Sequence, residues 1–351
     1  MAKKKLLYFC SSRSSFVEND LEIITQKYDV SVFIFHPKTK FYTPFTYCKQ
    51  FFFILKNIFS ADAYCCFFGG HHSLLPAFMG FVFRKPCIIF TGGTDCVSFP
   101  SINYGNFSKK ILGKITELSY RFATYIVPVH KSLVLCDYTY QDNDFPKQGF
   151  LYFCEKLKTP YTAIDLGFDA EKWKTSDLKI PNTFITVAAG LKSQYRTVLK
   201  GIDLILGTAK KFPQAQFSII GYPDNYILPD KPSNVKTYGF VSAEELKKLY
   251  NQNEFYLQVS ISEGFPNAIC EAMLCGCIPI GSTVGGISDI IGDAGFLLDK
   301  RDADKFEKII SSALQCDKRT LAKKAEERIK TNYPKEARVN KLLDLFSKII
   351  S

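Results

Sequence analysis

The chain has 351 residues, of which 46% are hydrophobic and 23% charged, the balance of a globular protein and a length that suits two domains. Its 12 cysteines include no Cys-x-x-Cys pair and no secretory signal precedes them, which argues against a disulfide framework or a zinc site and predicts reduced thiols in a cytoplasmic protein. The net charge of +11 predicts an anionic partner, a membrane surface or a nucleic acid. Because no zinc-finger spacing or RNA-binding aromatic motif is visible, we expect no nucleic acid.

Strands and helices alternate through the first half of the chain, which predicts a parallel sheet with helices on both faces. The uncharged run 64–83 matches the roughly 20 residues that cross a bilayer. Gly69, Gly70 and Pro76 interrupt that run, so a strand, a loop and a helix are the better interpretation. The expected strands are 4–10, 29–35, 63–68, 85–91 and 125–129, and the expected helices are 16–28, 74–83 and 108–123.

The stretch 38–59 interleaves lysines with aromatic residues. Such a mixture suits a membrane interface, where rings lie at headgroup depth and lysines meet anionic lipid. The alternative is that the rings cover the core of the domain, since exposed patches are functional only when they are contiguous. The aromatic members are Phe41, Tyr42, Phe45, Tyr47, Phe51, Phe52, Phe53 and Phe59.

The second half alternates again, so we expect another parallel sheet. One helix there opens with a capping box, Ser242 to Glu245. The expected strands are 183–188, 216–221, 235–238, 254–259 and 296–298, and the expected helices are 198–211, one after the capping box, one from 303 and a last one at 336–350.

The stretch from Ser262 to Met273 places two glutamates around the start of a helix. Pro266 and Asn267 suit that start, and Gly276 suits the end, where a left-handed cap costs glycine little. A helix N-terminus attracts anions, and glutamates on either side accept hydroxyl protons. This combination predicts a pocket for a nucleotide sugar.

Glu263 and Glu271, with seven residues between them inside Glu-Gly-Phe-Pro-Asn-Ala…Glu-Ala-Met, resemble the signature of glycosyltransferase family 4. The resemblance implies a retaining enzyme of the α/β GT-B fold, with two Rossmann-like domains whose parallel sheets face each other across a cleft. It implies an acceptor-binding domain at 1–166, a nucleotide-sugar-binding domain at 167–333, and a helix at 334–351 that returns to the first domain.

The same resemblance assigns roles in the second domain. Lys200 would balance the leaving diphosphate. The family's arginine usually follows the glycine after the preceding strand; here Leu191 follows Gly190, so Arg196 is the candidate. Glu271 would bind the ribose and Glu263 the sugar. The backbone of Gly264, Phe265, Pro266, Asn267 and Ala268 would meet the sugar or phosphate, and that around Phe240 and Val241 would hold the base edge.

The first domain departs from the family, because the histidine expected after the fourth strand is replaced by Gly92. Asp95 is a candidate for contact with donor or acceptor, and Gly69 and Gly70 would let the backbone approach a phosphate closely. Gly70, Gly92 and Gly93 are candidates on the acceptor or sugar side. His71, His72 and His130 follow strands and could supply the missing imidazole, although a loop histidine is more often a plain surface residue.

We expect no metal and no cofactor beyond the sugar nucleotide. The pairs Asp142/Asp144 and Asp302/Asp304 resemble a divalent-metal motif, but a polar loop and a helix start explain them structurally. The expected activity moves a hexose or N-acetylhexosamine from a nucleoside diphosphate to a saccharide acceptor, lipid-linked and at the inner face of the plasma membrane, in polysaccharide biosynthesis.

Two alternatives stay open. A sugar-nucleotide epimerase of GT-B fold would share the donor pocket, and a non-catalytic subunit could support a partner transferase. A dinucleotide dehydrogenase is a poorer fit, since no Gly-x-Gly-x-x-Gly follows the first strand.

Overall fold

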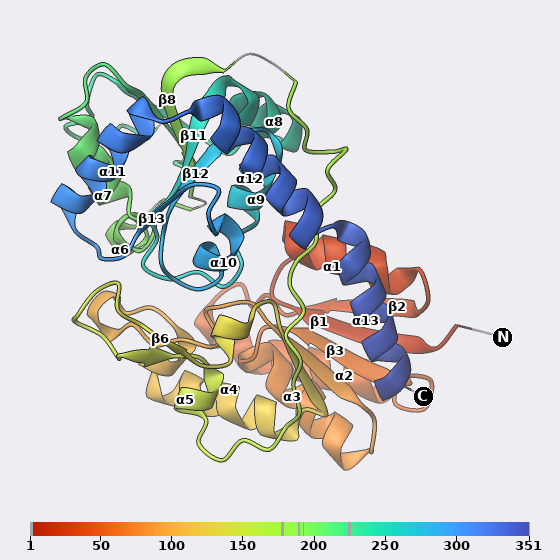
Figure 1. Ribbon diagram of the computed structural model, residues 1–351. Helices are drawn as coiled ribbons and strands as arrows, with labels where there is room; N and C mark the ends of the chain where they lie inside the picture. Colours follow the sequence, from red (N-terminus) through yellow and green to blue (C-terminus); the bar gives the residue numbers. More distant parts are fainter. Residues whose placement is uncertain (1–2, 177–178, 189, 192, 224–225, 351) are drawn as a thin grey trace. The chain divides into compact units, whose positions relative to one another are not determined.

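The chain forms two compact units in a computed structural model that describes residues 3–176, 179–188, 190–191, 193–223 and 226–350 (Figure 1). Unit 1 comprises Met1–Asp137, Lys147–Asp165 and Glu336–Ser351, and unit 2 comprises Tyr138–Pro146 and Leu166–Lys335. The main division at 165/166 therefore lies one residue before the expected one.

Unit 1 is built on a five-stranded parallel sheet of order β2-β1-β3-β4-β5. Its central strands are buried on both faces, as parallel strands between helices must be. The strands are β1 (Lys5–Cys10), β2 (Asp29–Ile34), β3 (Ala63–Phe67), β4 (Cys87–Thr91) and β5 (Tyr125–Pro128), and two short strands, β6 (Cys136–Asp137) and β7 (Lys147–Gln148), pair beyond them.

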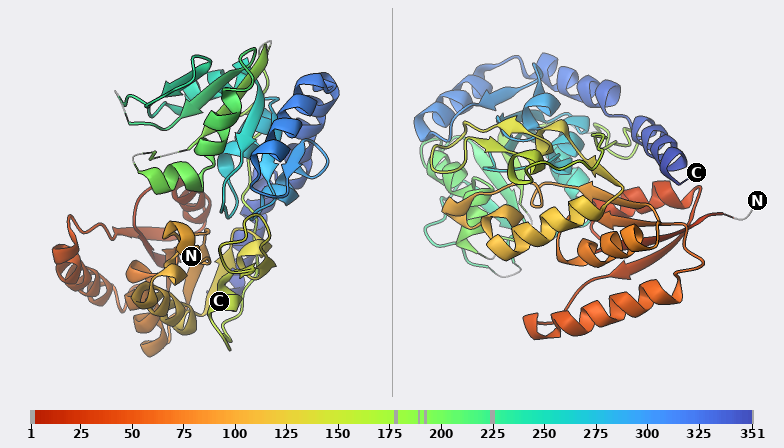
Figure 2. Two further views of the ribbon diagram at one scale, coloured as in Figure 1. Left: turned by 90° about the vertical axis from the view of Figure 1, so that its left-hand side faces the viewer. Right: turned by 90° about the horizontal axis from the view of Figure 1, so that it is seen from below.

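Helices cover both faces of this sheet (Figures 1 and 2). Tyr8 and Phe9, adjacent in β1, point to opposite faces: Phe9 packs on Phe53 of α2, whereas Asp20 of α1 lies near the Tyr8 hydroxyl. The helices are α1 (Ser15–Thr25), α2 (Thr43–Lys56), α3 (His71–Val82), α4 (Lys110–Phe122), α5 (Phe150–Phe153) and α13 (Lys335–Ile349), with 3-10 turns at Lys40–Tyr42, Pro100–Ile102, Asn106–Ser108 and Lys131–Leu133.

The last helix, α13, is fixed to unit 1 by a buried ion pair. Arg338 Nε and Nη2 each donate to Asp20 of α1 at 2.8 Å, and Nη1 donates to the carbonyl oxygens of Ile164 and Asp165. The bidentate geometry and the two carbonyl acceptors compensate the desolvation of both charges.

The uncharged run 64–83 folds as strand β3 and helix α3, as predicted. The helix begins three residues earlier than expected, so His71, His72 and Ser73 form its first turn instead of the preceding loop. The reason is local: Ser73 Oγ accepts from the amide of Gly70, which caps the helix start. Among the described residues, none of the helices has both the length and the apolar character to cross a membrane.

The stretch 38–59, which contains helix α2, exposes most of its aromatic residues. Phe53 packs on Phe9 and Phe33, but Phe41, Phe45, Phe52 and Phe59 are exposed, Phe59 by 99%. Core packing therefore accounts for only part of this stretch.

Unit 2 is built on a six-stranded parallel sheet of order β10-β9-β8-β11-β12-β13. Two parallel sheets in an α/β chain confirm the predicted fold class. The strands are β8 (Ile180–Val187), β9 (Gln216–Ile220), β10 (Val235–Tyr238), β11 (Asn253–Gln258), β12 (Ile278–Ser282) and β13 (Phe296–Leu298).

The helices of unit 2 differ from the prediction in two ways: one expected helix is broken, and two further helices are present. The single helix expected at 198–211 is broken at Lys200–Gly201, because Gly201 adopts a left-handed backbone conformation with φ of +67°. The helices α10 and α12 were not predicted at all. The helices are α6 (Gln194–Leu199), α7 (Ile202–Ala209), α8 (Ala243–Gln252), α9 (Asn267–Leu274), α10 (Ile287–Ile291), α11 (Ala303–Gln315) and α12 (Lys318–Asn332).

The segment Tyr138–Pro146 belongs to unit 2, although the sequence places it within the range expected for the first domain. Its tyrosine hydroxyls donate to backbone carbonyls beyond β11: Tyr138 to Ile261 at 3.0 Å and Tyr140 to Val259 at 3.4 Å. The amide of Arg301 in turn donates to the Tyr140 carbonyl. Such long-range bonds cannot be read from local sequence.

Candidate active site

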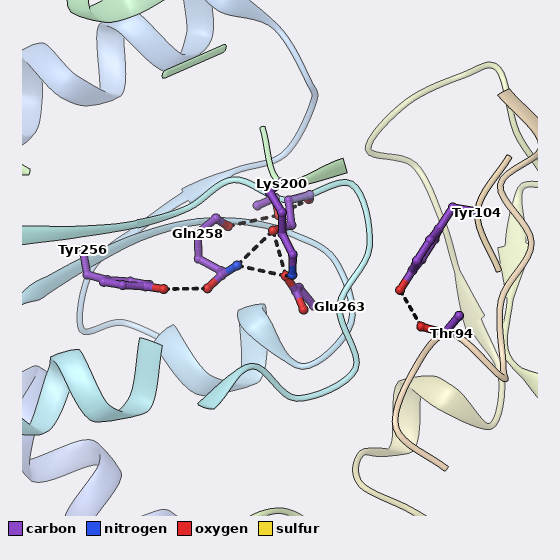
Figure 3. A network of polar contacts seen from close by, with 8 residues as sticks. Thr94, Tyr104, Lys200, Tyr256, Gln258 and Glu263 are labelled. Atoms are coloured by element: carbon purple, nitrogen blue, oxygen red, sulfur yellow. Dashed lines mark hydrogen bonds and ion pairs between the residues drawn. The ribbon is translucent and has the colours of Figure 1, made fainter. Parts of the chain in front are cut away.

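The loop between β11 and α9 carries Glu263, whose carboxylate is the centre of a polar network (Figure 3). Lys200 Nζ lies 2.6 Å from Glu263 Oε1, Ser260 Oγ donates to the same oxygen at 2.8 Å, and Gln258 Nε2 donates at 3.0 Å. Tyr256 Oη donates to Gln258 Oε1 and so orients the amide. Among the described residues no donor reaches Oε2, which leaves that oxygen available to a ligand hydroxyl.

Lys200 reaches Glu263 because its backbone lies against the end of β11. The amide of Ile261 donates to the carbonyl of Leu199 at 2.8 Å. A Cβ on Gly201 would lie 2.3 Å from the Val259 carbonyl oxygen, so only glycine allows this approach. The expected cation and the expected acid are therefore brought together, with side chains 25% and 12% exposed.

A second close approach supports the Glu263 loop from the other side. The amide of Gly286 donates to the carbonyl of Gly264 at 2.8 Å. At Gly285, where φ is +56°, a Cβ would lie 1.9 Å from the carbonyl oxygen of Glu263. Gly285 thus has a steric function beside the motif, and Gly286 supports the loop through its backbone amide.

Helix α9 begins at Asn267 after Pro266 and ends before Gly276, as the sequence predicts. The amides of Gly276 and Cys277 donate to the carbonyls of Met273 and Ala272, and Gly276 has a φ of +75°, a Schellman end. Burial raises the pKa of Glu271 in this helix to about 7, against an opposing effect of Lys172. The first amides of any helix lack partners within it and favour an anion.

The remaining residues of the motif divide between packing and ligand-facing roles. The Phe265 ring is buried, stacked on Phe168 and edge-on to Tyr333, so only its backbone is left for a ligand. Asn267 Oδ1 is buried, and no described residue donates a hydrogen bond to it. An unsatisfied acceptor at the first turn of α9 fits a ligand that brings a hydrogen-bond donor.

The loop after β8 brings Gly190 and Arg196 together. A Cβ on Gly190, where φ is +76°, would lie 3.1 Å from Arg196 Nη1, and Arg196 Nε donates to Tyr195 Oη. The arginine therefore lies beside the glycine that it usually follows directly in the family. After β10, Phe240 is 91% exposed and Val241 is partly buried.

Asp95 in unit 1 has a structural role that differs from the ligand contact expected for it. Its carboxylate is buried and accepts from the amides of Gly69, Gly92 and Gly93 and from the hydroxyl of Tyr120. Burial raises its pKa, and these donors oppose the shift. Asp95 therefore ties together the two glycine loops that follow β3 and β4.

The three candidate histidines have different surroundings. His72 is buried, its Nε2 contacts the Phe67 carbonyl, and burial lowers its pKa to about 4. His130 is buried with its Nδ1 on Ser132. His71 is exposed at the start of α3, after Gly70. Tyr47 Oη donates a hydrogen bond to the His71 carbonyl and lies 3.3 Å from its Nδ1. Only His71 retains access to a ligand.

Sequence reasoning missed Gln258 and Ser260, which hold Glu263 in place. A signal existed: both are polar residues at the carboxyl end of a buried parallel strand, an edge where ligands bind. Of the aspartate pairs, Asp302 caps helix α11 by accepting from Lys305 N, and Asp142 pairs with Lys300. The described residues include no cluster of three or more metal-ligating side chains.

Two Rossmann-like units, each with a parallel sheet, and an acid–lysine pair at the carboxyl end of a strand define the GT-B class. Among solved structures, sucrose-phosphate synthase of Thermosynechococcus elongatus has a TM-score of 0.74 at 14% identity, covering 99% of each chain. HepE of Anabaena, solved in complex with UDP-glucose, has a TM-score of 0.73 at 15% identity, covering 98% of this chain and 99% of that one. At these identities the likeness concerns the fold.

Residues 181–335 match the family described as glycosyl transferases group 1. The O-antigen chain mannosyltransferase B of Escherichia coli is 35% identical over 132 residues, which cover 36% of this chain and 35% of that protein. The aligned part thus spans about a third of this relative. The resemblance inferred from the Glu263–Glu271 motif is confirmed.

Proposed function

We propose that the protein is a retaining glycosyltransferase that moves a hexose or N-acetylhexosamine from a nucleoside-diphosphate sugar to a lipid-linked saccharide acceptor. The observation that carries the proposal is the Lys200–Glu263 pair beside the start of α9, with Glu263 Oε2 left available. A diphosphate at this helix start would compete with Glu263 for Lys200. The carboxylate would then accept from sugar hydroxyls.

In the proposed reaction Lys200 and Arg196 stabilise the charge that develops on the leaving diphosphate. Glu271, whose carboxylate can accept two hydrogen bonds when ionised, holds the ribose. The leaving phosphate oxygen takes the proton of the acceptor hydroxyl as the new glycosidic bond forms on the face where the old one breaks. The protein contributes position and charge, and the proposal needs no divalent metal.

The acceptor part of the proposal draws on two further observations. The name of the O-antigen mannosyltransferase relative indicates surface-polysaccharide synthesis for that protein. The exposed phenylalanines of the stretch 38–59 and the lysines interleaved with them suit a peripheral contact with the inner face of an anionic membrane.

The first experiment is a thermal-shift screen against UDP-, GDP-, ADP- and dTDP-sugars, because a bound donor raises stability in proportion to ln(1 + [L]/Kd). Donor consumption with and without acceptor follows, in the presence of EDTA. Transfer by the isolated chain that is lost in Glu263→Gln and Lys200→Ala supports the proposal. Lys210→Ala, at an exposed lysine in the same unit, is the control.

Two results would favour the alternatives. An epimerised donor formed without acceptor would indicate an epimerase. Donor binding with neither hydrolysis nor transfer, despite acceptor and lipid, would indicate a non-catalytic subunit, and the histidine missing after β4 keeps this alternative open.

A further inference from the structure

A pocket of about 790 Å³ lies in unit 1 where strands β4 and β5 begin. Pro86 and Thr124, which line it, precede these strands directly. The loops that carry Gly92 and His130 follow the same strands, so they lie at the opposite edge of the sheet. Within unit 1 the pocket is therefore separate from the loops that carry Gly92 and His130.

The pocket is strongly basic, with five cationic lining residues and no acidic one. Lys85 donates to the Ala61 carbonyl, and Arg121 donates to the side chain of Glu117 and the carbonyl of Glu155. The side chains of the other three, Arg84, Lys156 and Lys158, form neither an ion pair nor a hydrogen bond with any described residue. Three uncompensated cations around one hollow attract an anion with several oxygen acceptors, such as a phosphate.

Exposed apolar side chains adjoin these cations. Phe81 lines the pocket and is 64% exposed, and Phe78, Val82 and Phe83 at the same end of α3 are also exposed. Phe78 and Phe81 pack on the ring of Phe122, another lining residue. A soluble phosphate would use only the cations, whereas a lipid headgroup would use the cations and bring acyl chains to the rings.

We propose that this pocket binds the phosphate-bearing headgroup of an anionic phospholipid, with Phe81 and Phe83 at the level of the acyl chains. A strand of five residues such as β4 spans roughly 17 Å, so the lipid held here is an anchor and not the acceptor. The inference rests on the membrane contact of the proposed function and adds a lipid-binding site to the exposed stretch 38–59. Its test uses neither donor nor acceptor, so its failure is distinct from a failure of the transferase proposal.

The test is co-sedimentation of the full chain with phosphatidylcholine vesicles that contain 30% phosphatidylglycerol, at 0.1 M NaCl. The triple variant Arg84→Gln/Lys156→Gln/Lys158→Gln removes the uncompensated cations, and Lys210→Gln/Lys236→Gln/Lys323→Gln removes the same charge from exposed positions of unit 2. We expect the first variant to bind at least tenfold more weakly and the second to change less than twofold. An equal loss of vesicle affinity in the two triple variants, or no vesicle binding by the unaltered chain, would overturn the proposal.

A second measurement separates a lipid from a soluble phosphate. In Phe81→Trp, a lipid with a brominated acyl chain should quench the fluorescence of the introduced tryptophan. The fluorescence of the native Trp173, which is buried, should be quenched little in the unaltered chain. Thermal melts establish that each variant is folded. Calorimetric binding of soluble glycerol phosphate without quenching of the introduced indole would assign the pocket to a soluble ligand and refute the lipid proposal.

Discussion

Lys200 Nζ and Glu263 Oε1 lie 2.6 Å apart although 63 residues separate them in the chain. In the protein without donor, each charge partly neutralises the other. In the proposed function a bound diphosphate would take over Lys200, so the pair would hold both groups in position until the substrate binds.

Lys200→Ala should lower kcat by about 100-fold or more, because the leaving diphosphate loses a preorganised cation. Glu263→Gln keeps the shape of the side chain but removes its charge, and it should lower kcat by a similar factor. The measurement is donor turnover with acceptor under saturating conditions. Lys210→Ala should remain within twofold of the unaltered protein, and a near-normal kcat in Lys200→Ala would contradict the assigned role.

The stability of the protein should depend on Glu271 in a particular pH window. Burial raises the pKa of this carboxyl to about 7, from its ordinary value of 4.5 in an unfolded chain. The folded state therefore binds more protons between these values, and stability falls as pH rises through the window, by about 3 kcal/mol at most. Glu271→Gln should be more stable than the unaltered chain at pH 8 and similar at pH 5, as urea titrations at both pH values would show.

Donor affinity should have the opposite dependence on pH. In the proposed function ribose hydroxyls would donate to the ionised form of Glu271, so nucleotide binding should weaken as pH falls from 8 to 6 and should release a proton near pH 7. Calorimetry in buffers of different ionisation enthalpy measures that proton. The pH dependence should vanish in Glu271→Gln; persistence of the full dependence there would assign it to another group.

Gly285→Ala should disturb the active-site loop through the backbone alone. The added Cβ would lie 1.9 Å from the Glu263 carbonyl oxygen, and φ at position 285 is +56°. We therefore expect the free energy of unfolding to fall by about 2 kcal/mol or more, and the activity to fall with it. Gly207 in helix α7 is the matched control, since a Cβ there meets nothing within 4 Å. Gly207→Ala should stabilise the protein by about 0.5–1 kcal/mol.

Asp20→Ala should destabilise unit 1 by about 3–5 kcal/mol, because it leaves the guanidinium of Arg338 buried without its counter-charge. The double variant Asp20→Leu/Arg338→Met should recover part of that loss. Asp344 and Lys348 form an exposed ion pair in the same helix, so Asp344→Ala should cost less than about 0.5 kcal/mol. Thermal unfolding of the four proteins would test this order.

Much of the fold was accessible from the sequence because its signals are local. Buried strands such as β3 read as apolar runs, Ser242 caps α8 through the amide of Glu245, and Gly276 ends α9 as glycine does at a left-handed cap. The break at Gly201 was not predicted because a glycine within a helical pattern does not reveal whether its φ is positive or negative. That angle is imposed by the Val259 carbonyl, which is distant in sequence.

The candidate site was accessible only in part for the same reason. The motif identified Glu263 and Lys200, but residue type and position could not distinguish an aspartate that meets a ligand from one that ties loops together. Asp95 is of the second kind because the amides of Gly69, Gly92 and Gly93 converge on it in space. Burial likewise separates His72 and His130 from His71, and no pattern in the neighbouring residues records that difference.

The hydroxyls of Tyr138 and Tyr140 have a practical consequence for any dissection of the protein. A fragment limited to the stretch shared with the family would leave the carbonyls of Val259 and Ile261 without these donors, next to the loop that carries Glu263. A hybrid protein that exchanges unit 2 between relatives would therefore need Tyr138–Pro146 transplanted with it.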